Sequence, residues 1–275
     1  MKIDIILEPD LTPQEICDLG LIAESYGVDS IWTSNYFSHW DPFISLTQLA
    51  NQSSEVKLGV LAVSPFEMHP LKIANSLLTL NEVSQGRAQV AVGAGEGNLT
   101  AMNLKTPKKI VLAVREALEI IIKACSDDLK EGYIGEIFNV SLPCDYGWAK
   151  HEKPVVYGTA YRHMMMRMEG RVADGVYIGA TPPEVLEEAI ININTGKEKR
   201  LDGDEEILIK SVDDFMQIDF YKDDFYENLL NLDKEENIFL LCRSGRRSGL
   251  AAKFLTENGY SKIYNIKGGI NSIKD

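Results

Sequence analysis

A strand-helix-strand pattern in the first third of the chain constrains the fold more than any other feature. Lys57 to Val63 is a short apolar run rich in branched residues, which is typical of a buried strand. His69-Pro70 then opens a helix, Gly86 ends it, and residues 88–92 form a second apolar run. Two strands joined by such a helical crossover run parallel, and parallel strands need cover on both faces. The pattern therefore predicts an α/β fold around a buried parallel sheet.

The same alternation continues on both sides of this unit. Upstream, the sequence predicts a strand over 2–8, a helix from Thr12-Pro13 to Gly27 and a strand over 30–33. Downstream, the predicted elements are a helix from Thr106-Pro107 through Cys125, a hairpin over 131–140, a strand over 154–158, a helix over 161–172, a strand over 175–179, a helix from Pro182-Pro183 to about Ile193, and a further strand over 206–210.

Composition narrows the function classes. The formal net charge is −13, and because phosphate backbones are held by basic faces, this argues against a general nucleic-acid binder. No apolar run approaches the length that spans a bilayer, which argues against membrane insertion. The amino terminus enters a strand directly, without the pattern of a signal peptide, so we expect a cytoplasmic protein.

The cysteines and histidines show no spacing that indicates a metal centre or a disulfide framework. The four cysteines are Cys17, Cys125, Cys144 and Cys242. The methionines of the helix over 161–172 are interpreted as core packing. We therefore predict no metal site, and only Cys242 lies in a distinctive chemical context.

Several short segments resemble the luciferase-like oxidoreductases, most of all the deazaflavin-dependent methylenetetrahydromethanopterin reductases of methanogens. These segments are Leu58-Gly59, Ser64-Pro65-Phe66, His69-Pro70, residues 80–87 and Gly93-Ala94-Gly95. The resemblance covers about residues 1–200 and implies a (β/α)8-type barrel, with deazaflavin or flavin mononucleotide bound at the carboxyl ends of the strands. The resemblance implies that the cofactor-binding positions are Asn35, Leu61, Ala62, Gly93, Gly95 and Gly179. The resemblance is also compatible with a small-molecule redox substrate and with a homo-oligomer formed through the barrel.

The glycine cluster over 93–97 has two interpretations. It follows a predicted strand, where backbone amides can approach a phosphate or a ring. Its glycine spacing is not that of the dinucleotide fingerprint, and a tight turn explains it equally well.

Two positions depart from the pattern of the luciferase-like family. After the second strand the family commonly has an Asp-His pair, whereas this chain has Asn35-Tyr36, an amide and a phenol that do not replace a carboxylate and an imidazole in proton transfer near neutral pH. The deazaflavin-dependent members often have a glycine before a non-proline cis peptide, whereas this chain has Leu61-Ala62. A cis bond there costs about 3 kcal/mol, and the Leu61 side chain would crowd the ring, so we expect the bulge to be lost and redox activity to be weakened.

Residues 237–248 carry the sharpest chemical motif. An apolar strand over 237–241 delivers Cys242, and a helix follows it, so the thiol lies at a strand end near a helix amino terminus and three arginines. Such a setting lowers the pKa of a thiol. The stretch over about 216–275 resembles the carboxyl-terminal part of a rhodanese sulfurtransferase, but the Asp-Val-Arg triplet usual upstream is missing. The resemblance implies that Cys242 carries a persulfide taken from a small-molecule sulfur donor, stabilised by Arg247 and by the loop residues Arg243, Ser244, Gly245, Arg246 and Ser248.

The composition changes near residue 205, between the polar stretch 195–204 and the acidic stretch 213–236. We predict an incomplete luciferase-like barrel over 1–204, which lacks recognisable last strand-helix units, and a partial rhodanese-like unit over 205–275. A competing hypothesis is a non-catalytic binding scaffold. In it, the two parts complete one barrel through the strands predicted over 206–210, 237–241 and 262–266.

Overall fold

The structure is a computed structural model of the chain. It describes residues 3–105, 107–179, 183–200, 208–211, 225–234, 238–240 and 246–265. The chain divides into two compact units, Met1–Asp214 and Phe215–Asp275, and each is described by itself.

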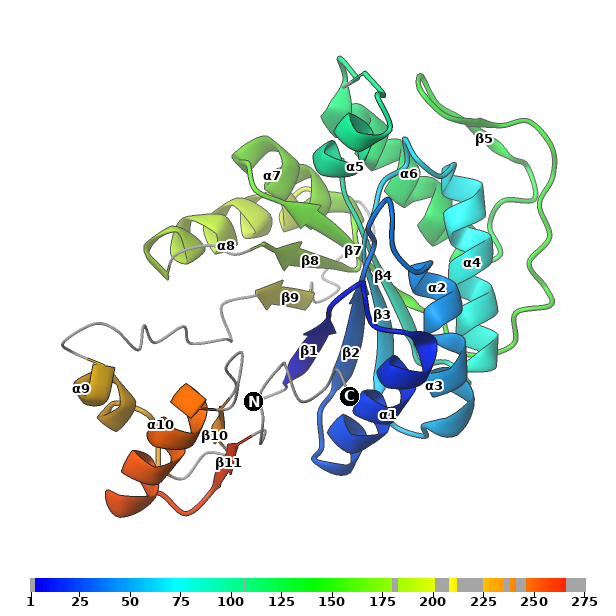
Figure 1. The fold of residues 1–275 in the computed structure, drawn as a ribbon. Coiled ribbons are helices and arrows are strands. Elements are labelled where there is room, and N and C mark those ends of the chain that lie inside the picture. Colours follow the sequence, from blue (N-terminus) through cyan, green and yellow to red (C-terminus); the bar gives the residue numbers. More distant parts are fainter. Residues whose placement is uncertain are drawn as a thin grey trace. The chain divides into compact units, whose positions relative to one another are not determined.

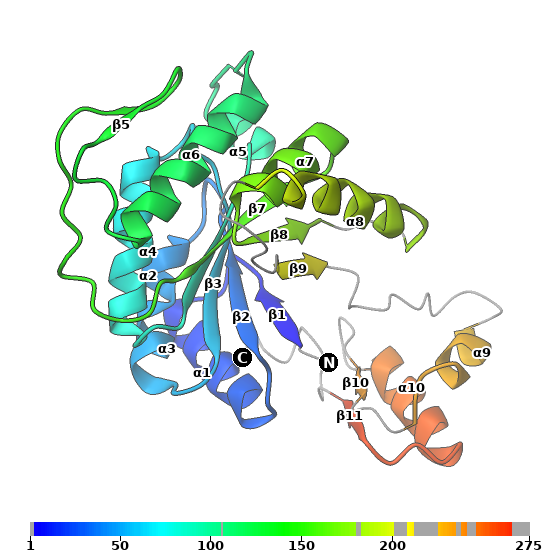
Figure 2. The same cartoon turned by 180° about the vertical axis from the view of Figure 1, so that it is seen from behind.

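The first unit is built on a seven-stranded sheet with the strand order β1-β2-β3-β4-β7-β8-β9, in which every neighbouring pair is parallel. The sheet curls into a half-barrel (Figures 1 and 2). Its strands are β1 (Asp4–Leu7), β2 (Ser30–Ser34), β3 (Lys57–Val63), β4 (Ala88–Val92), β7 (Val155–Ala160), β8 (Gly175–Ile178) and β9 (Leu208–Ser211). The parallel α/β architecture predicted from the sequence is confirmed.

Helices follow the strands and lie along the outer side of the curled sheet (Figure 1). They are α1 (Pro13–Ser25), α2 (Pro42–Ser45), α3 (Thr47–Gln52), α4 (Pro70–Val83), α5 (Glu96–Ala101), α6 (Ile110–Cys125), α7 (His163–Val172) and α8 (Pro183–Lys197). Local signals set their ends: Thr12 and Glu15 form a capping box at α1, and Gly27 has a left-handed φ of 78° just beyond it. The boundaries of α1 and α4 therefore follow from short-range sequence chemistry.

Two helix boundaries differ from the prediction. Helix α6 begins at Ile110, after the exposed lysines at 108–109, because the buried stripe of this helix starts only at Ala113; Thr106 lies outside the described residues. Helix α8 runs to Lys197 rather than ending near Ile193. A β-carbon added to Gly196 would lie 2.0 Å from the carbonyl oxygen of Arg167, so the last turn of α8 packs directly on the backbone of α7.

The three strands of the scaffold hypothesis separate into two groups. Strand β9 pairs with β8, with Leu208 opposite Gly175, so this segment extends the half-barrel sheet. Strands β10 (Ile238–Leu240) and β11 (Ile263–Asn265) pair in parallel with each other. One of the three predicted strands thus joins the sheet of the first unit.

The second unit surrounds the β10–β11 pair with two helices, α9 (Phe225–Leu230) and α10 (Arg246–Glu257). Among its described residues, Phe225, Leu229, Ala251, Leu255 and Tyr260 form a buried hydrophobic cluster. Gly259 has a left-handed φ of 85° just beyond α10, a conformation that is typical of a glycine at a helix end.

The hairpin predicted over 131–140 is present as β5 (Tyr133–Ile134) and β6 (Asn139–Val140), which pair antiparallel. The carboxylate of Glu116, 2% exposed on α6, accepts hydrogen bonds from the backbone N–H groups of Glu136, Ile137 and Phe138 at 2.8–2.9 Å. Burial opposes ionisation of Glu116, but these three amides outweigh it and lower the pKa of the carboxyl. One buried carboxylate thereby fixes the hairpin to α6.

The inner face of the half-barrel is packed around Trp32. Its ring lies edge-on to Tyr157 and Tyr177, at centroid distances of 5.7 and 5.3 Å, and its Nε1–H donates to Asp4 at 2.9 Å. Ala91 completes this cluster, and Leu61 packs against it. The interior is therefore filled by large side chains, as in other small barrels.

Replacing Gly59 by alanine is expected to destabilise the protein by about 1–3 kcal/mol, the usual cost of overpacking a core. The added β-carbon would lie 2.2 Å from Cε3 of the fully buried Trp32. Gly97→Ala is the matched control, because a β-carbon at Gly97 meets nothing within 4 Å. Urea unfolding followed by circular dichroism compares the two, and equal midpoints would contradict the prediction.

Candidate functional site

The residues predicted to bind a cofactor lie at one edge of the sheet. Leu61 and Ala62 belong to the carboxyl-terminal half of β3, while the other positions directly follow strands: Asn35 after β2, Gly93 after β4 and Gly179 after β8. Because all these strands run parallel, their carboxyl ends meet at the same edge. The fold therefore places positions far apart in sequence at a common edge.

Asn35 joins β2 to the end of β3. Its backbone N–H donates to the carbonyl oxygen of Leu61 at 2.7 Å, and its side-chain Nδ2 donates to the carbonyl oxygen of Ala62 at 3.1 Å. The peptide bond between Leu61 and Ala62 is cis, and the register of β3 against β4 shifts between Val60 and Val63. The expected loss of the bulge is therefore wrong. The Leu61 side chain packs towards the cluster around Trp32, so its size does not prevent the bulge.

Glu67 organises this edge, and the sequence analysis missed it. Its Oε1 accepts from the side-chain amide of Asn35 and from the backbone N–H of Ser64, the latter at 3.2 Å. Its Oε2 accepts from Nδ2 of Asn98 at 2.8 Å. One half-buried carboxylate thus links the loops that follow β2, β3 and β4. The available signal was weak: an acidic residue shortly after a strand end, without a recognised motif.

The glycines at 93 and 95 make close internal contacts. A β-carbon at Gly93 would lie 2.0 Å from Oγ1 of Thr159, and one at Gly95 would lie 2.5 Å from Cβ of Ser64. Gly95 also has a left-handed φ of 67°, and Oγ of Ser64 donates to the carbonyl oxygen of Ala94 at 2.9 Å. These contacts account for a tight turn at this place. The approach of the turn amides to a cofactor stays a prediction.

Gly179, directly after β8, lies against the ring of Tyr161. A β-carbon at Gly179 would lie 2.1 Å from the hydroxyl oxygen of Tyr161, whose side chain is 73% exposed. Tyr161 directly follows β7, next to β8 in the sheet. Any side chain at position 179 would displace this ring from its place at the rim.

Exposed aromatic side chains follow Asn35. Tyr36 stacks on Phe37 with ring centroids 4.7 Å apart, and His39 packs edge-on against Tyr36 at 5.1 Å. Tyr36 and Phe37 are each 47% exposed. The phenol of Tyr36 therefore lies in an outward-facing aromatic group, while the amide of Asn35 is engaged with Ala62 and Glu67.

The sulfur-carrying motif is described only in part. Cys242, Arg243, Ser244 and Gly245 lie outside the described residues, whereas Arg246, Arg247 and Ser248 form the first turn of α10. Strand β10 ends at Leu240, so five residues that include Cys242 connect it to α10. This is the strand and helix pair that the sequence predicts around the cysteine.

The described cysteines, Cys17, Cys125 and Cys144, are free thiols. Burial raises the pKa of Cys17, helped by the neighbouring Asp18. Burial also raises the pKa of Cys125 to about 12. Both thiols are therefore protonated near neutral pH.

In the part of the chain that the structure describes, no helix is both long and apolar enough to cross a lipid bilayer. The same residues contain no group of three or more histidine, cysteine, aspartate or glutamate side chains arranged to hold a metal ion.

Comparison with known proteins agrees with the fold of the first unit. The 5,10-methylenetetrahydromethanopterin reductase of Archaeoglobus fulgidus is 31% identical over 199 residues, covering 72% of this chain and 59% of the relative. The F420-dependent glucose-6-phosphate dehydrogenase of Kineococcus radiotolerans is 29% identical over 176 residues, covering 59% of this chain and 51% of the relative. The chain therefore spans only about half to three-fifths of the length of these curated relatives.

The solved structure of the coenzyme F420-dependent tetrahydromethanopterin reductase from Methanopyrus kandleri shares the fold, with a TM-score of 0.66 at 22% identity over 89% of this chain and 67% of that one. A family model described as a rhodanese-like domain matches residues 191–275. A second model, described as luciferase-like monooxygenase, matches residues 3–210. The chain belongs to the luciferase-like family.

Proposed function

We propose that the carboxyl edge of the half-barrel binds a deazaflavin or flavin mononucleotide and presents it to a small redox substrate. The observation that carries the proposal is the network around Glu67, which holds the loops after β2, β3 and β4 together at that edge. Similar proteins are named as F420-dependent enzymes or were solved with flavin mononucleotide. Ligand sites in barrels of this kind lie at the same edge.

The bound cofactor supplies hydride chemistry, and the residues of this chain hold and orient it. Glu67 fixes the amide of Asn35, and Asn35 fixes the carbonyl groups of Leu61 and Ala62. The amide of Asn35 does not titrate, so it positions groups and moves no proton. We therefore infer that cofactor binding is retained while turnover is slow, because proton transfer has no acid or base at position 35.

Titrating the purified full chain with deazaflavin and with flavin mononucleotide tests this proposal. We expect saturable binding of at least one of them, weakened at least ~10-fold, or about 1.4 kcal/mol, in Glu67→Ala. Glu82→Ala is the matched control, since Glu82 also accepts backbone hydrogen bonds, from Lys150 and His151, but follows no strand of the edge. Absence of binding, or equal losses in both variants, would overturn the proposal, and rapid hydride transfer would overturn the inference of slow turnover.

We also propose a second activity, sulfur transfer through Cys242. The match to the rhodanese-like model over 191–275 favours it, as does the placement of Cys242 between the end of β10 and the start of α10. Arg246 and Arg247 begin that helix, so positive charge and backbone N–H groups gather near the cysteine position. Transfer of sulfur from thiosulfate to cyanide by the full chain tests this activity directly.

A further inference from the structure

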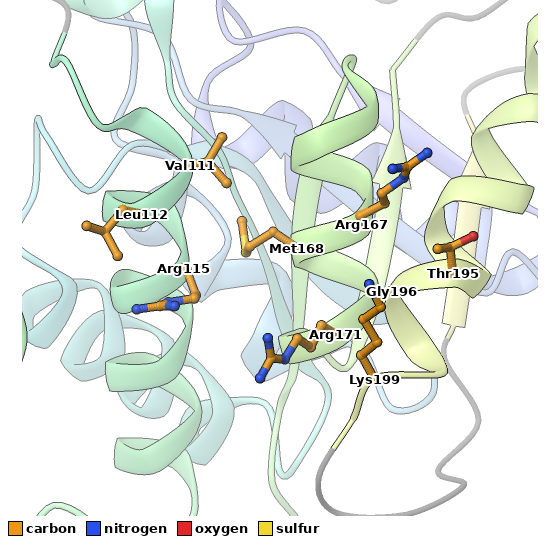
Figure 3. A pocket seen from close by; sticks show the side chains of 9 residues that line it. All are labelled: Val111, Leu112, Arg115, Arg167, Met168, Arg171, Thr195, Gly196 and Lys199. Atoms are coloured by element: carbon orange, nitrogen blue, oxygen red, sulfur yellow. The ribbon is translucent and has the colours of Figure 1, made fainter.

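A basic groove lies among the helices α6, α7 and α8 (Figure 3). It crosses the exposed side of α7 between α6 and the last turn of α8, and has a volume of about 420 Å³. This is within the range of about 300–1,000 Å³ that is usual for small-molecule sites. The floor is apolar and includes Val111 and Met168.

Four cations and no acidic side chain line this groove: Arg115, Arg167, Arg171 and Lys199. This local excess of positive charge is unusual in a chain with 41 acidic and 28 basic residues. Cations at helix carboxyl ends interact favourably with the helix dipole, which explains Arg171 and Lys199. It does not explain Arg115, in the second turn of α6, or Arg167, in the middle of α7.

The cations of the groove have few anionic partners among the described residues. Arg115 pairs with Glu119 at 3.4 Å, yet its buried Nε–H makes no hydrogen bond. Arg167 donates its Nε–H to the neutral amide oxygen of Asn192 at 2.7 Å. For Arg171 and Lys199, the described residues provide no ion pair. Three positive charges of the groove are thus left to attract an anion.

The side chains leave room for a ligand over α7. In Figure 3 the guanidinium group of Arg171 is directed towards α6, while Lys199 extends along the groove towards Gly196. Met168 lies between α6 and these charges. A volume of about 420 Å³ holds roughly 14 groups the size of a water molecule, at roughly 30 Å³ each.

We infer that this groove binds a small amphipathic anion, a phosphate monoester that carries an apolar body of about ten carbon atoms. The phosphate lies among Arg167, Arg171 and Lys199, and the apolar body covers Val111 and Met168. Arginine and lysine suit a doubly charged phosphate because their N–H groups give charge-assisted hydrogen bonds. This site is separate from the cofactor edge and does not depend on redox chemistry.

Calorimetric titration of the full chain with 1-naphthyl phosphate, 1-naphthol and inorganic phosphate tests the inference. We expect the ester to bind at least ~10-fold more tightly than either part alone, and less tightly as salt is raised. The double variant Arg171→Gln, Lys199→Gln is expected to lose at least ~10-fold in affinity for the ester. Lys253→Gln is the control, since Lys253 is an exposed cation of α10, and it should bind as the parent does.

Circular dichroism of the double variant checks that it is folded. Glu67→Ala should bind the ester as the parent does, which separates this site from the cofactor edge. Equal affinity for the three probes would overturn the inference. Unchanged binding in the folded double variant, or an equal loss in Lys253→Gln, would overturn it too.

Discussion

Replacement of Cys242 by serine is expected to abolish the transfer of sulfur from thiosulfate to cyanide, lowering the rate at least ~1,000-fold. In this reaction the thiolate attacks the outer sulfur of thiosulfate, sulfite leaves, and the cysteine holds a persulfide. Cyanide then takes that sulfur as thiocyanate and returns the thiolate. A serine hydroxyl is a far weaker nucleophile near neutral pH and holds no sulfane sulfur.

We expect this activity because α10, which follows the five-residue connection from β10, begins with two arginines. Helix α10 has twelve residues, and its first turn carries Arg246 and Arg247. Positive charge at a helix amino terminus favours a thiolate over a thiol. Arg247→Ala should therefore slow both sulfur transfer and thiol alkylation, whereas Arg247→Lys should retain part of each rate.

Cys144→Ser is the control for this experiment, because Cys144 is a free thiol in the first unit. It should transfer sulfur at the rate of the parent. Two outcomes speak against a persulfide at Cys242: activity that survives Cys242→Ser, and an alkylation profile over pH that matches an ordinary free cysteine.

Substitution of Glu169 by glutamine is expected to remove a loss of stability that the parent shows as pH rises. Glu169 is completely buried on α7, and both of its carboxyl oxygens are without a hydrogen-bond partner among the described residues. Burial raises the pKa of this carboxyl well above its ordinary value. A β-carbon at Gly158 would lie 2.4 Å from Cδ of Glu169, so the Glu169 carboxyl packs directly against the backbone of β7.

The direction in which stability changes with pH follows from the number of protons that each state binds. In the unfolded chain a glutamate ionises near pH 4.3, whereas in the folded state Glu169 keeps its proton to a higher pH. Between these two pKa values the folded state binds more protons, so its free energy of unfolding falls by about 1.4 kcal/mol for each pH unit. The stabilising difference is complete below the unfolded pKa and is lost as pH rises through the folded pKa.

Glu116→Gln provides a control of the opposite sign. The pKa of Glu116 is lowered, because the amides of the hairpin outweigh its burial, so its contribution is present above the unfolded pKa and lost as pH falls. Urea unfolding of the parent and both variants, from about pH 3 to about pH 8, covers the range below the unfolded pKa, where Glu116 changes stability, and the range above it, where Glu169 does. Parallel profiles for the parent and Glu169→Gln would show that Glu169 does not retain its proton on folding.

Most strands and helices of the first unit could be predicted from the sequence because their signals are local. Apolar runs such as Lys57–Val63 and caps such as Thr12 act over a few residues, and the structure reproduces them. The end of α8 could not be read, because it depends on the approach of Gly196 to the backbone of α7. Such contacts arise only when the chain has folded.

The candidate site, too, was only partly predictable from the sequence. Positions 35, 61 and 93 were expected from the family resemblance, and the parallel strands bring the strand ends that carry them to one edge of the sheet. Glu67 was missed because its role comes from Asn35 and Asn98, which are 32 and 31 positions away in the chain. The bulge of β3 was misjudged because the expectation placed the Leu61 side chain against a cofactor ring, whereas it packs into the barrel interior.

Strand β9 has a consequence for how this chain can be divided. Its residues 208–210 lie within both family matches, 3–210 and 191–275, and the strand pairs with β8. The two family regions therefore overlap in a segment that belongs to a sheet, and do not simply meet at a linker. An expression fragment that stops at residue 204 would leave β8, whose four residues are all buried, as a bare edge of the sheet. A fragment that continues through Asp214 would keep β9 with the strand that it covers.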